Sequence, residues 1–299
     1  MSLERIPVGL LLAISMAVAL GGGIVKYYFC IRISGGAADR QVYNGVTSLA
    51  AAVVLVLWGG VSSVSLFTLL LGIAFGIVTA LQQITSLKAL EQGPWAYTSV
   101  IISLSTLIPA LSGMLFWSER ILWPQIVGMV LIAGCLILSV NYKSDQKKAS
   151  FQWLFYCLIA FVCTGMIGVM QKWHQNSDSK PELNAFLAIA FFVSFAYSAI
   201  SWGVLQRRNR AKTGGALGYW LPTCLMIGGG ICAAINNKLN LFLSGAMQSA
   251  VFFPIVNGGG LVLTTVTAVL FFRERLTSRQ WIGLSLGILS VVFLCNPFV

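Results

Sequence analysis

The sequence carries few charged residues, because Asp, Glu, Lys and Arg make up only 9% of it while apolar residues make up 58%. A soluble domain contains about 25% charged residues, so this composition excludes an ordinary soluble protein. Apolar runs of about 20 residues recur along the chain, and each is long enough to cross a hydrocarbon core about 30 Å thick as a helix. Membrane strands need only about ten residues of alternating polarity, so helices are predicted rather than a barrel.

The apolar runs number ten, and short connections separate them. The predicted spans are 7–30, 43–60, 66–87, 94–117, 121–140, 151–173, 183–205, 217–243, 246–272 and 279–296. The first run could also be read as a signal peptide cleaved near Ala19, but its apolar character continues to Phe29, which favours an uncleaved span. We therefore predict an all-α integral membrane protein with ten transmembrane helices.

Acidic residues are missing from the middle of every predicted span. The eight acidic side chains, all outside the spans or at their edges, are Glu4, Asp39, Glu91, Glu119, Asp145, Asp178, Glu182 and Glu274. An antiporter that exchanges protons for a cation at a buried carboxylate is thereby disfavoured. Cationic cargo stays open, because aromatic faces also hold polyatomic cations.

Catalytic and metal-binding groups are similarly scarce. The single His174 lies at a span end, where we expect a solvated or interfacial side chain, and the seven cysteines form no CxxC pair. Without a nucleophile, its base and an orienting group, we expect no enzyme, no cofactor and no metal site. The net charge of +11 comes from basic residues scattered over short loops, where they orient the chain and touch anionic lipid, so we expect no nucleic-acid partner.

The chain repeats itself. The segment "LFWSERILWPQIVG" (115–128) matches "LFFRERLTSRQWIG" (270–283) at an offset of 155. At this or a slightly shorter offset the paired residues are Glu119 with Glu274, Gln125 with Gln280, Gly72 and Gly76 with Gly228–Gly230, Gln82 and Gln83 with Asn237 and Lys238, Lys26 with Lys172, and Asn44 with Asn184. Because each half holds an odd number of spans, the second copy must enter the membrane from the side opposite to that of the first copy. We predict two inverted five-helix repeats, residues 1–145 and 146–299, with a solute site between them.

A family resemblance follows from these features. Ten spans in two halves, a lysine closing spans 1 and 6, and "[FW]xER" followed by "QxxG" in both halves resemble the drug/metabolite transporter superfamily of EamA type. The resemblance covers nearly the whole chain. It implies a carrier of small solutes, including amino acids, other metabolites and drugs, whose central cavity is lined mainly by spans 1, 3, 4, 6, 8 and 9.

Polar residues inside the spans are the candidates for solute contact, because a polar group facing hydrocarbon is costly and should face protein or a wet cavity. These residues are Gln82 and Gln83 in span 3, Asn236, Asn237, Lys238 and Asn240 in span 8, and Gln248 and Asn257 in span 9.

The stretch "FFPIVNGGGLVL" (252–263) combines Pro254, Asn257 and three glycines inside a strongly apolar run. Proline removes a helix hydrogen bond and glycine lets another backbone approach, so this segment can kink or hinge. Two interpretations stay open: close helix packing alone, or packing together with a cavity wall to which Asn257 offers its amide. Pro109 in span 4 marks a second expected kink.

The lysines and interfacial aromatics have two interpretations each. Lys26 and Lys238 lie near span ends, so each can extend its ammonium to the interface, or else place it in the pathway to bind a carboxylate or phosphate. For Lys172, next to Trp173, we expect the interfacial position. Tyr97 is treated as a candidate contact, although anchoring in the aromatic belt is its default role.

The sequence therefore predicts a secondary transporter, functional as a monomer in the cell inner membrane, that moves a small polar or zwitterionic metabolite, amino-acid-like or an organic anion, by alternating access. The alternatives are an exporter of hydrophobic or cationic drugs and a receptor or scaffold without transport. The predicted substrate-binding residues are Lys26, Gln82, Gln83, Tyr97, Asn237, Lys238, Gln248 and Asn257.

Orientation follows from the basic residues. Five of the 19 lie on the side of the N-terminus and fourteen on the other side, so the positive-inside rule predicts that both termini lie outside the cytoplasm. The family usually keeps both termini inside. We follow the charge distribution.

Overall fold

The computed structural model describes residues 6–33, 36–60, 64–92, 98, 101–138, 150–209, 220–272 and 278–295. The helices of the first half are α1 (Val8–Arg32), α2 (Ala37–Gly59), α3 (Leu66–Gln92), the 3-10 turn η2 (Leu104–Thr106), α5 (Leu107–Trp117) and α6 (Trp123–Leu138). Those of the second half are α7 (Phe151–Gln175), η3 (Lys180–Glu182), α8 (Leu183–Asn209), α9 (Trp220–Ala246), α10 (Ser249–Phe272) and α11 (Ser278–Cys295). Within these described ranges no residue lies in a strand.

The predicted all-α class is confirmed, and a described helix overlaps each predicted span. Five segments are long and apolar enough to cross a membrane: Val8–Lys26, Ala37–Gly59, Leu66–Gln92, Phe151–Gln175 and Lys180–Arg207. Their length and composition are those of a helical membrane protein. Several helices continue past the predicted apolar run, because intrahelical hydrogen bonds persist where the side chains become polar.

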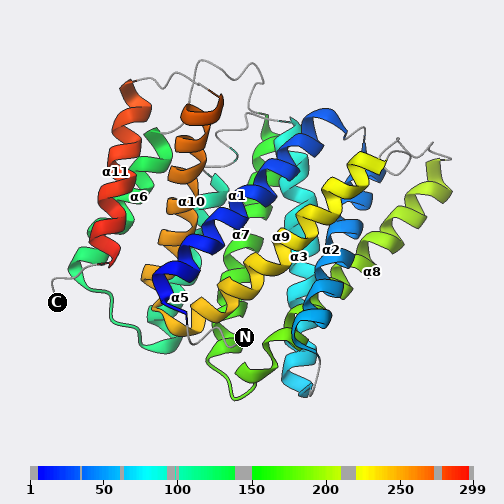
Figure 1. Cartoon of the computed structure of the whole chain (residues 1–299), viewed down its shortest axis with the longest axis horizontal. Coiled ribbons are helices and arrows are strands. Elements are labelled where there is room, and N and C mark those ends of the chain that lie inside the picture. The colour runs from blue at the N-terminus through cyan, green and yellow to red at the C-terminus, as the bar shows by residue number, and fades with distance from the viewer. Residues whose placement is uncertain are drawn as a thin grey trace.

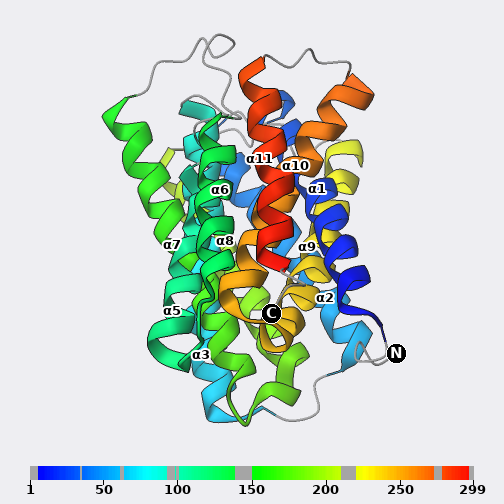
Figure 2. The ribbon, with the colours of Figure 1, turned by 90° about the vertical axis from the view of Figure 1, so that its left-hand side faces the viewer.

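The helices form a bundle with a pair at each edge. Helices α6 and α11 lie side by side at one edge, and α2 and α8 pack together at the other (Figure 1). The same α6 and α11 pair faces the viewer in Figure 2. Between the edges stand α1, α3, α7, α9 and α10, so these helices surround the centre of the molecule.

Helices α2 and α8 run antiparallel. Asn44, in the first half of α2, donates to Ser198 Oγ, in the second half of α8, at 2.6 Å. Asn184, in the first turn of α8, lies against Gly59, the last residue of α2. Each helix therefore begins beside the end of the other.

Glycines allow two further close helix contacts. A Cβ added at Gly76 in α3 would lie 2.4 Å from the carbonyl oxygen of Ala190 in α8. A Cβ at Gly230 in α9 would lie 2.5 Å from the carbonyl oxygen of Thr47 in α2. Both contacts are too close for any side chain, so glycine is what permits α3 to pack on α8 and α9 to pack on α2.

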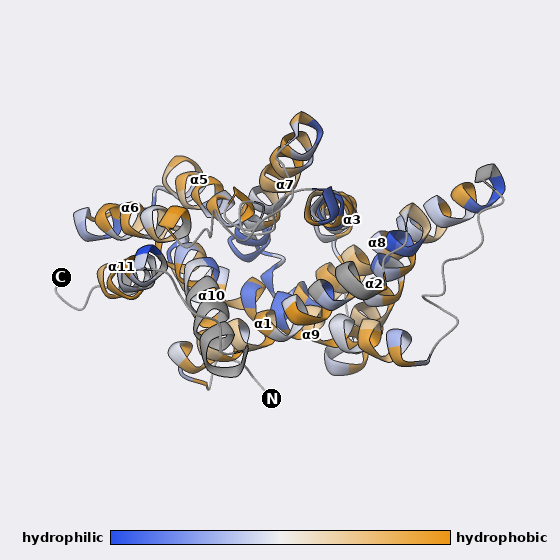
Figure 3. Cartoon of the chain, turned by 90° about the horizontal axis from the view of Figure 1, so that it is seen from above, coloured by the Kyte–Doolittle hydropathy of each residue, from blue (hydrophilic) through white to orange (hydrophobic). Residues whose placement is uncertain are grey.

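The largest apolar core lies where α2, α3, α8 and α9 meet. Phe75 and Phe186 cross edge to face there, with ring centroids 5.0 Å apart, and Leu55 and Leu241 are fully buried beside them. Viewed from above, hydrophilic segments lie in the middle of the bundle, between α7 and α10 (Figure 3). The centre of the molecule is thus polar, whereas a membrane helix bundle with a fully packed core would be apolar there.

Candidate functional site

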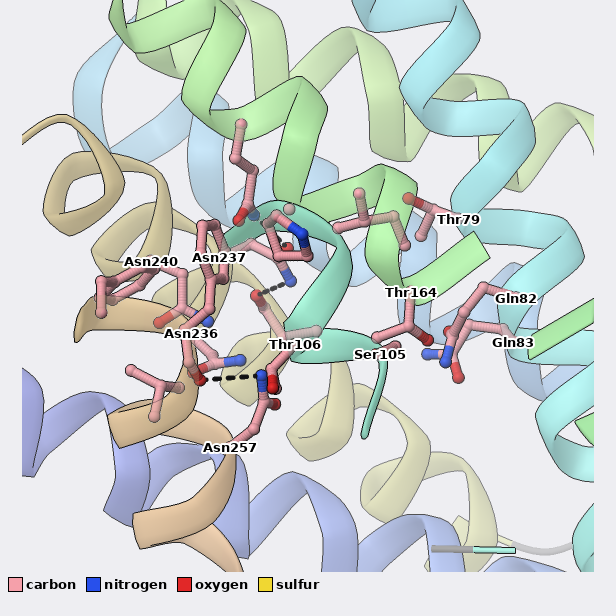
Figure 4. Close-up of a pocket in the computed structure, with 18 of the residues that line it drawn as sticks. Thr79, Gln82, Gln83, Ser105, Thr106, Thr164, Asn236, Asn237, Asn240 and Asn257 are labelled. Carbon is pink, nitrogen blue, oxygen red and sulfur yellow. Dashed lines mark hydrogen bonds between the residues drawn. The ribbon is translucent and has the colours of Figure 1, made fainter. Parts of the chain in front are cut away.

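A polar cavity of about 200 Å³ lies at the centre of the bundle (Figure 4). Its polar lining consists of Thr79, Gln82, Gln83, Ser105, Thr106, Thr164, Gln171, Asn236, Asn237, Asn240 and Asn257. Apolar walls come from Phe191, Phe252 and Phe253, among others. The structure thus brings four of the predicted contact residues, Gln82, Gln83, Asn237 and Asn257, to one cavity.

Helix α3 supplies one wall through Thr79, Gln82 and Gln83. These positions are three and four residues apart, so they share one helix face. Lys26 Nζ, which is not among the lining residues, donates to Gln83 Oε1 at 2.8 Å and to Ser86 Oγ at 3.0 Å and so orients the Gln83 side chain. The Gln82 amide makes no side-chain hydrogen bond to any described residue, so it is available to a solute.

Helix α9 supplies the opposite wall (Figure 4). Asn236 and Asn240 are one turn apart, and the hydroxyl of the fully buried Ser15 on α1 lies 3.0 Å from Asn236 Oδ1 and 2.6 Å from Asn240 Oδ1. Asn237 donates to the carbonyl of Ala233 at 3.0 Å. The hydroxyl of Ser15 thereby orients two amides whose nitrogens, among the described residues, have no acceptor.

Helix α10 serves both as cavity wall and as packing surface. Asn257 lines the cavity and donates to the carbonyl of Phe253 at 3.2 Å. A Cβ at Gly259 would lie 2.7 Å from Met16 Sδ, so the glycines also admit α1. The helix is continuous through Pro254, which lacks the N–H that would bond to Ala250. The structure therefore agrees with the second interpretation of this stretch, in which it packs closely against another helix and also forms a cavity wall.

Several lining residues escaped the sequence interpretation. Ser105 and Thr106 belong to the 3-10 turn η2, which leads into α5 just before Pro109. Thr164 and Gln171 come from α7. Serine and threonine can satisfy their own helix backbone, as Thr164 does at the carbonyl of Ala160, so their position in an apolar run gives no clear signal of a cavity.

Three predicted contact residues within the described part of the chain, Lys26, Lys238 and Gln248, are not among the lining residues. Lys238 is buried in α9 with Nζ 4.1 Å from the centroid of the Trp58 ring, so its ammonium points to a cation–π contact and not to the lining. Gln248 accepts from Gln125 Nε2 at 3.2 Å, ahead of α10. Tyr97 lies outside the described residues.

A buried ion pair joins α7 to the connection between α5 and α6. Lys172, expected at the interface, is only 4% exposed, and its Nζ lies 2.6 Å from Glu119 Oε1 and 2.8 Å from the carbonyl of Met247. Glu119 also accepts from the backbone N–H of Ser249 at 2.8 Å, where it caps the start of α10. The interfacial expectation for Lys172 was wrong, because a carboxylate from the α5–α6 junction reaches it inside the protein.

His174 also departs from expectation, since its side chain is fully buried and not solvated. Its ring stacks on Phe186 with centroids 4.4 Å apart and an interplanar angle of 25°. Among the described residues no group of three His, Cys, Asp or Glu side chains is placed to hold a metal ion.

Comparisons with known proteins bear on the fold alone. No family model matches the chain. A relative from Haemophilus influenzae, itself described as an uncharacterized protein, is 25% identical over 228 residues, which cover 74% of this chain and 73% of the relative. A protein of known crystal structure shares 13% sequence identity and superposes with a TM-score of 0.71, covering 95% of this chain and 96% of that one. The chain therefore shares its fold with a protein of very different sequence.

Proposed function

We propose that the chain is a secondary transporter that moves a small polar or zwitterionic metabolite across the membrane by alternating access. The observation that carries the proposal is the central cavity, with eleven hydroxyl- or amide-bearing side chains gathered between long apolar helices. Polar groups at such a depth are costly unless they meet protein or water. A cavity built from them is suited to replace the hydration shell of a polar solute.

The proposal includes ten membrane-crossing helices in two inverted repeats. The antiparallel pairing of α2 with α8 supports it, because these helices are the equivalent second members of the two halves. The glycine contacts support it too: Gly76 lies on α8 in the way that Gly230 lies on α2, and the sequence repeat aligns the same glycine clusters. Inverted repeats around a midplane site are a recurrent transporter design.

Membership of the EamA-type drug/metabolite transporters is part of the proposal and rests on the repeated motifs. Glu119, from the first copy of the "[FW]xER" motif, pairs with Lys172, which closes span 6. Two of the residues that carry the resemblance, Glu119 and Lys172, thus form an ion pair in the folded chain. We further propose the cell inner membrane as the location, a monomer as the working unit, and no catalysis.

The rival drug exporter fits the cavity less well. Pockets for drug-sized ligands enclose roughly 300–1,000 Å³, whereas this cavity has a volume of about 200 Å³. No acidic side chain belongs to the described lining, so a cationic drug would find no counter-charge there, only neutral oxygens and the phenyl rings of Phe191, Phe252 and Phe253.

Flux through purified protein in proteoliposomes tests the proposal. We expect saturable uptake of a radiolabelled polar solute, and we expect Asn237→Ala to reduce it at least tenfold, because this amide stands in the middle of the α9 wall. Gln152→Ala, an exposed amide at the start of α7, is the matched control and should transport normally. Movement of quaternary amines alone would favour the drug exporter, and no flux of any solute would favour the scaffold.

A further inference from the structure

We infer that the solute is uncharged and presents hydrogen-bond donors and acceptors side by side, as polyols, amides and nucleobases do. The inference rests on the proposed function and narrows its substrate class, since it excludes both organic anions and zwitterions. It comes from three features of the cavity: the absence of formal charge on its described lining, the occupation of nearby cations by other partners, and the mixture of unused donors and acceptors.

No Lys, Arg, Asp, Glu or His belongs to the described lining of the cavity. Three lysines of the bundle interior stay outside the described lining. Lys172 pairs with Glu119, Lys238 lies over Trp58, and Lys26 donates to Gln83 and Ser86. A carboxylate or phosphate in the cavity would lose its hydration without forming an ion pair with any residue of the described lining, which is costly away from water.

Helix termini do not replace the missing charge. At η2 the chain stays helical, because Thr106 has φ −57° and ψ −25°, and the N–H of Leu107 bonds to the carbonyl of Leu104. The turn therefore exposes no set of free N–H groups that could bind an anion. At the start of α10, the N–H of Ser249 is taken by the carboxylate of Glu119.

The unused hydrogen-bonding groups are of both kinds. The oxygens of Asn236 and Asn240 face Ser15, and the oxygen of Gln83 accepts from Lys26, so these three amides keep their NH₂ groups as donors. Asn257 uses its nitrogen at Phe253 and keeps its oxygen as an acceptor. Gln82 keeps both groups. A solute with neighbouring donors and acceptors would bond to both the free NH₂ groups and the free oxygens of these amides. A simple anion would leave the free oxygens unpaired, and a simple cation would leave the free NH₂ groups unpaired.

The test is a flux panel in proteoliposomes with matched variants. The uncharged probes are mannitol, uracil and nicotinamide; glycine and glutamine are the zwitterions, succinate the anion and choline the cation. We expect saturable movement of at least one uncharged probe only. Gln82→Ala should raise the KM for that probe about tenfold, because one or two hydrogen bonds to the solute are lost.

One control variant accompanies it. Gln92→Ala changes an exposed amide at the end of the same helix α3 and should keep the parental KM. Elution as a single peak in size-exclusion chromatography verifies folding of each variant. Movement of succinate, glycine or glutamine without any uncharged probe would overturn this inference and leave the transporter proposal standing. Movement of choline alone would overturn this inference and favour the drug exporter. A panel in which nothing moves would overturn both.

Discussion

At the residue scale, the cost of burying a polar group singled out seven amides, and six of them line the cavity: Gln82, Gln83, Asn236, Asn237, Asn240 and Asn257. Amides have short side chains, so they stay near the depth of their own Cα. The exception is Gln248, which precedes α10 and accepts from Gln125.

The same reasoning failed for lysine, because four methylene groups let the ammonium reach a partner far from its backbone. Lys238 reaches Trp58, and Lys172 reaches Glu119. Sequence position gives the depth of the backbone, but it does not say which way so long a side chain turns.

The ion pair of Lys172 and Glu119 yields a prediction at this scale. Lys172→Met should lower the free energy of unfolding by about 3 kcal/mol, because it leaves a buried carboxylate without its counter-charge. Glu119→Gln keeps an oxygen that can cap α10, but it leaves the buried ammonium of Lys172 without a counter-charge. This variant should therefore also destabilise the fold. Apparent melting temperatures in detergent measure both effects.

The double variant Glu119→Gln with Lys172→Met serves as the control for that pair. With both charges removed, we expect less destabilisation than the sum of the two single changes. Simple additivity would mean that the two charges do not interact in the folded protein.

At the element scale, the positions of the helices follow from apolar runs and their lengths, and these were predictable from sequence. The irregular turn η2 was not, since a single 3-10 turn inside an apolar run leaves the hydropathy pattern unchanged. Pro109 was the one hint, because it lies within the first turn of α5 that follows. The sequence also did not predict which helices pack together. Glycine clusters indicate that another helix approaches closely, but they do not identify that helix.

Glycine packing provides the prediction at this scale. Gly230→Ala should destabilise the protein by roughly 1–3 kcal/mol, because its methyl group would press on the backbone of α2 at Thr47. Gly228→Ala, half a turn away on the same helix, has nothing within 4 Å of the added Cβ and is the matched control. We expect its melting temperature in detergent to stay unchanged or to rise slightly. Equal losses from both variants would contradict the close approach of α9 to α2.

At the scale of the whole molecule, burial sharpens the orientation argument. The N-terminal side was assigned Arg5, Arg120, Lys172, Lys180 and Lys238, yet two of these, Lys172 and Lys238, are buried inside the bundle. Buried lysines with partners of their own contribute little to the positive-inside rule, which concerns loops. The remaining loop charges are even more strongly concentrated on the opposite side.

Thiol labelling tests this orientation. Asn176 is exposed at the end of α7, on the side of the N-terminus, and position 147 belongs to the basic connection between the halves, outside the described residues. In a background with the native cysteines replaced, Asn176→Cys should react with a membrane-impermeant maleimide added to whole cells, whereas Lys147→Cys should react only after the cells are opened. The charge asymmetry then faces the cytoplasm, as the rule requires. The reverse pattern, with labelling from outside at position 147 but not at 176, would place both termini inside and show that the distribution of basic residues does not set the orientation of this chain.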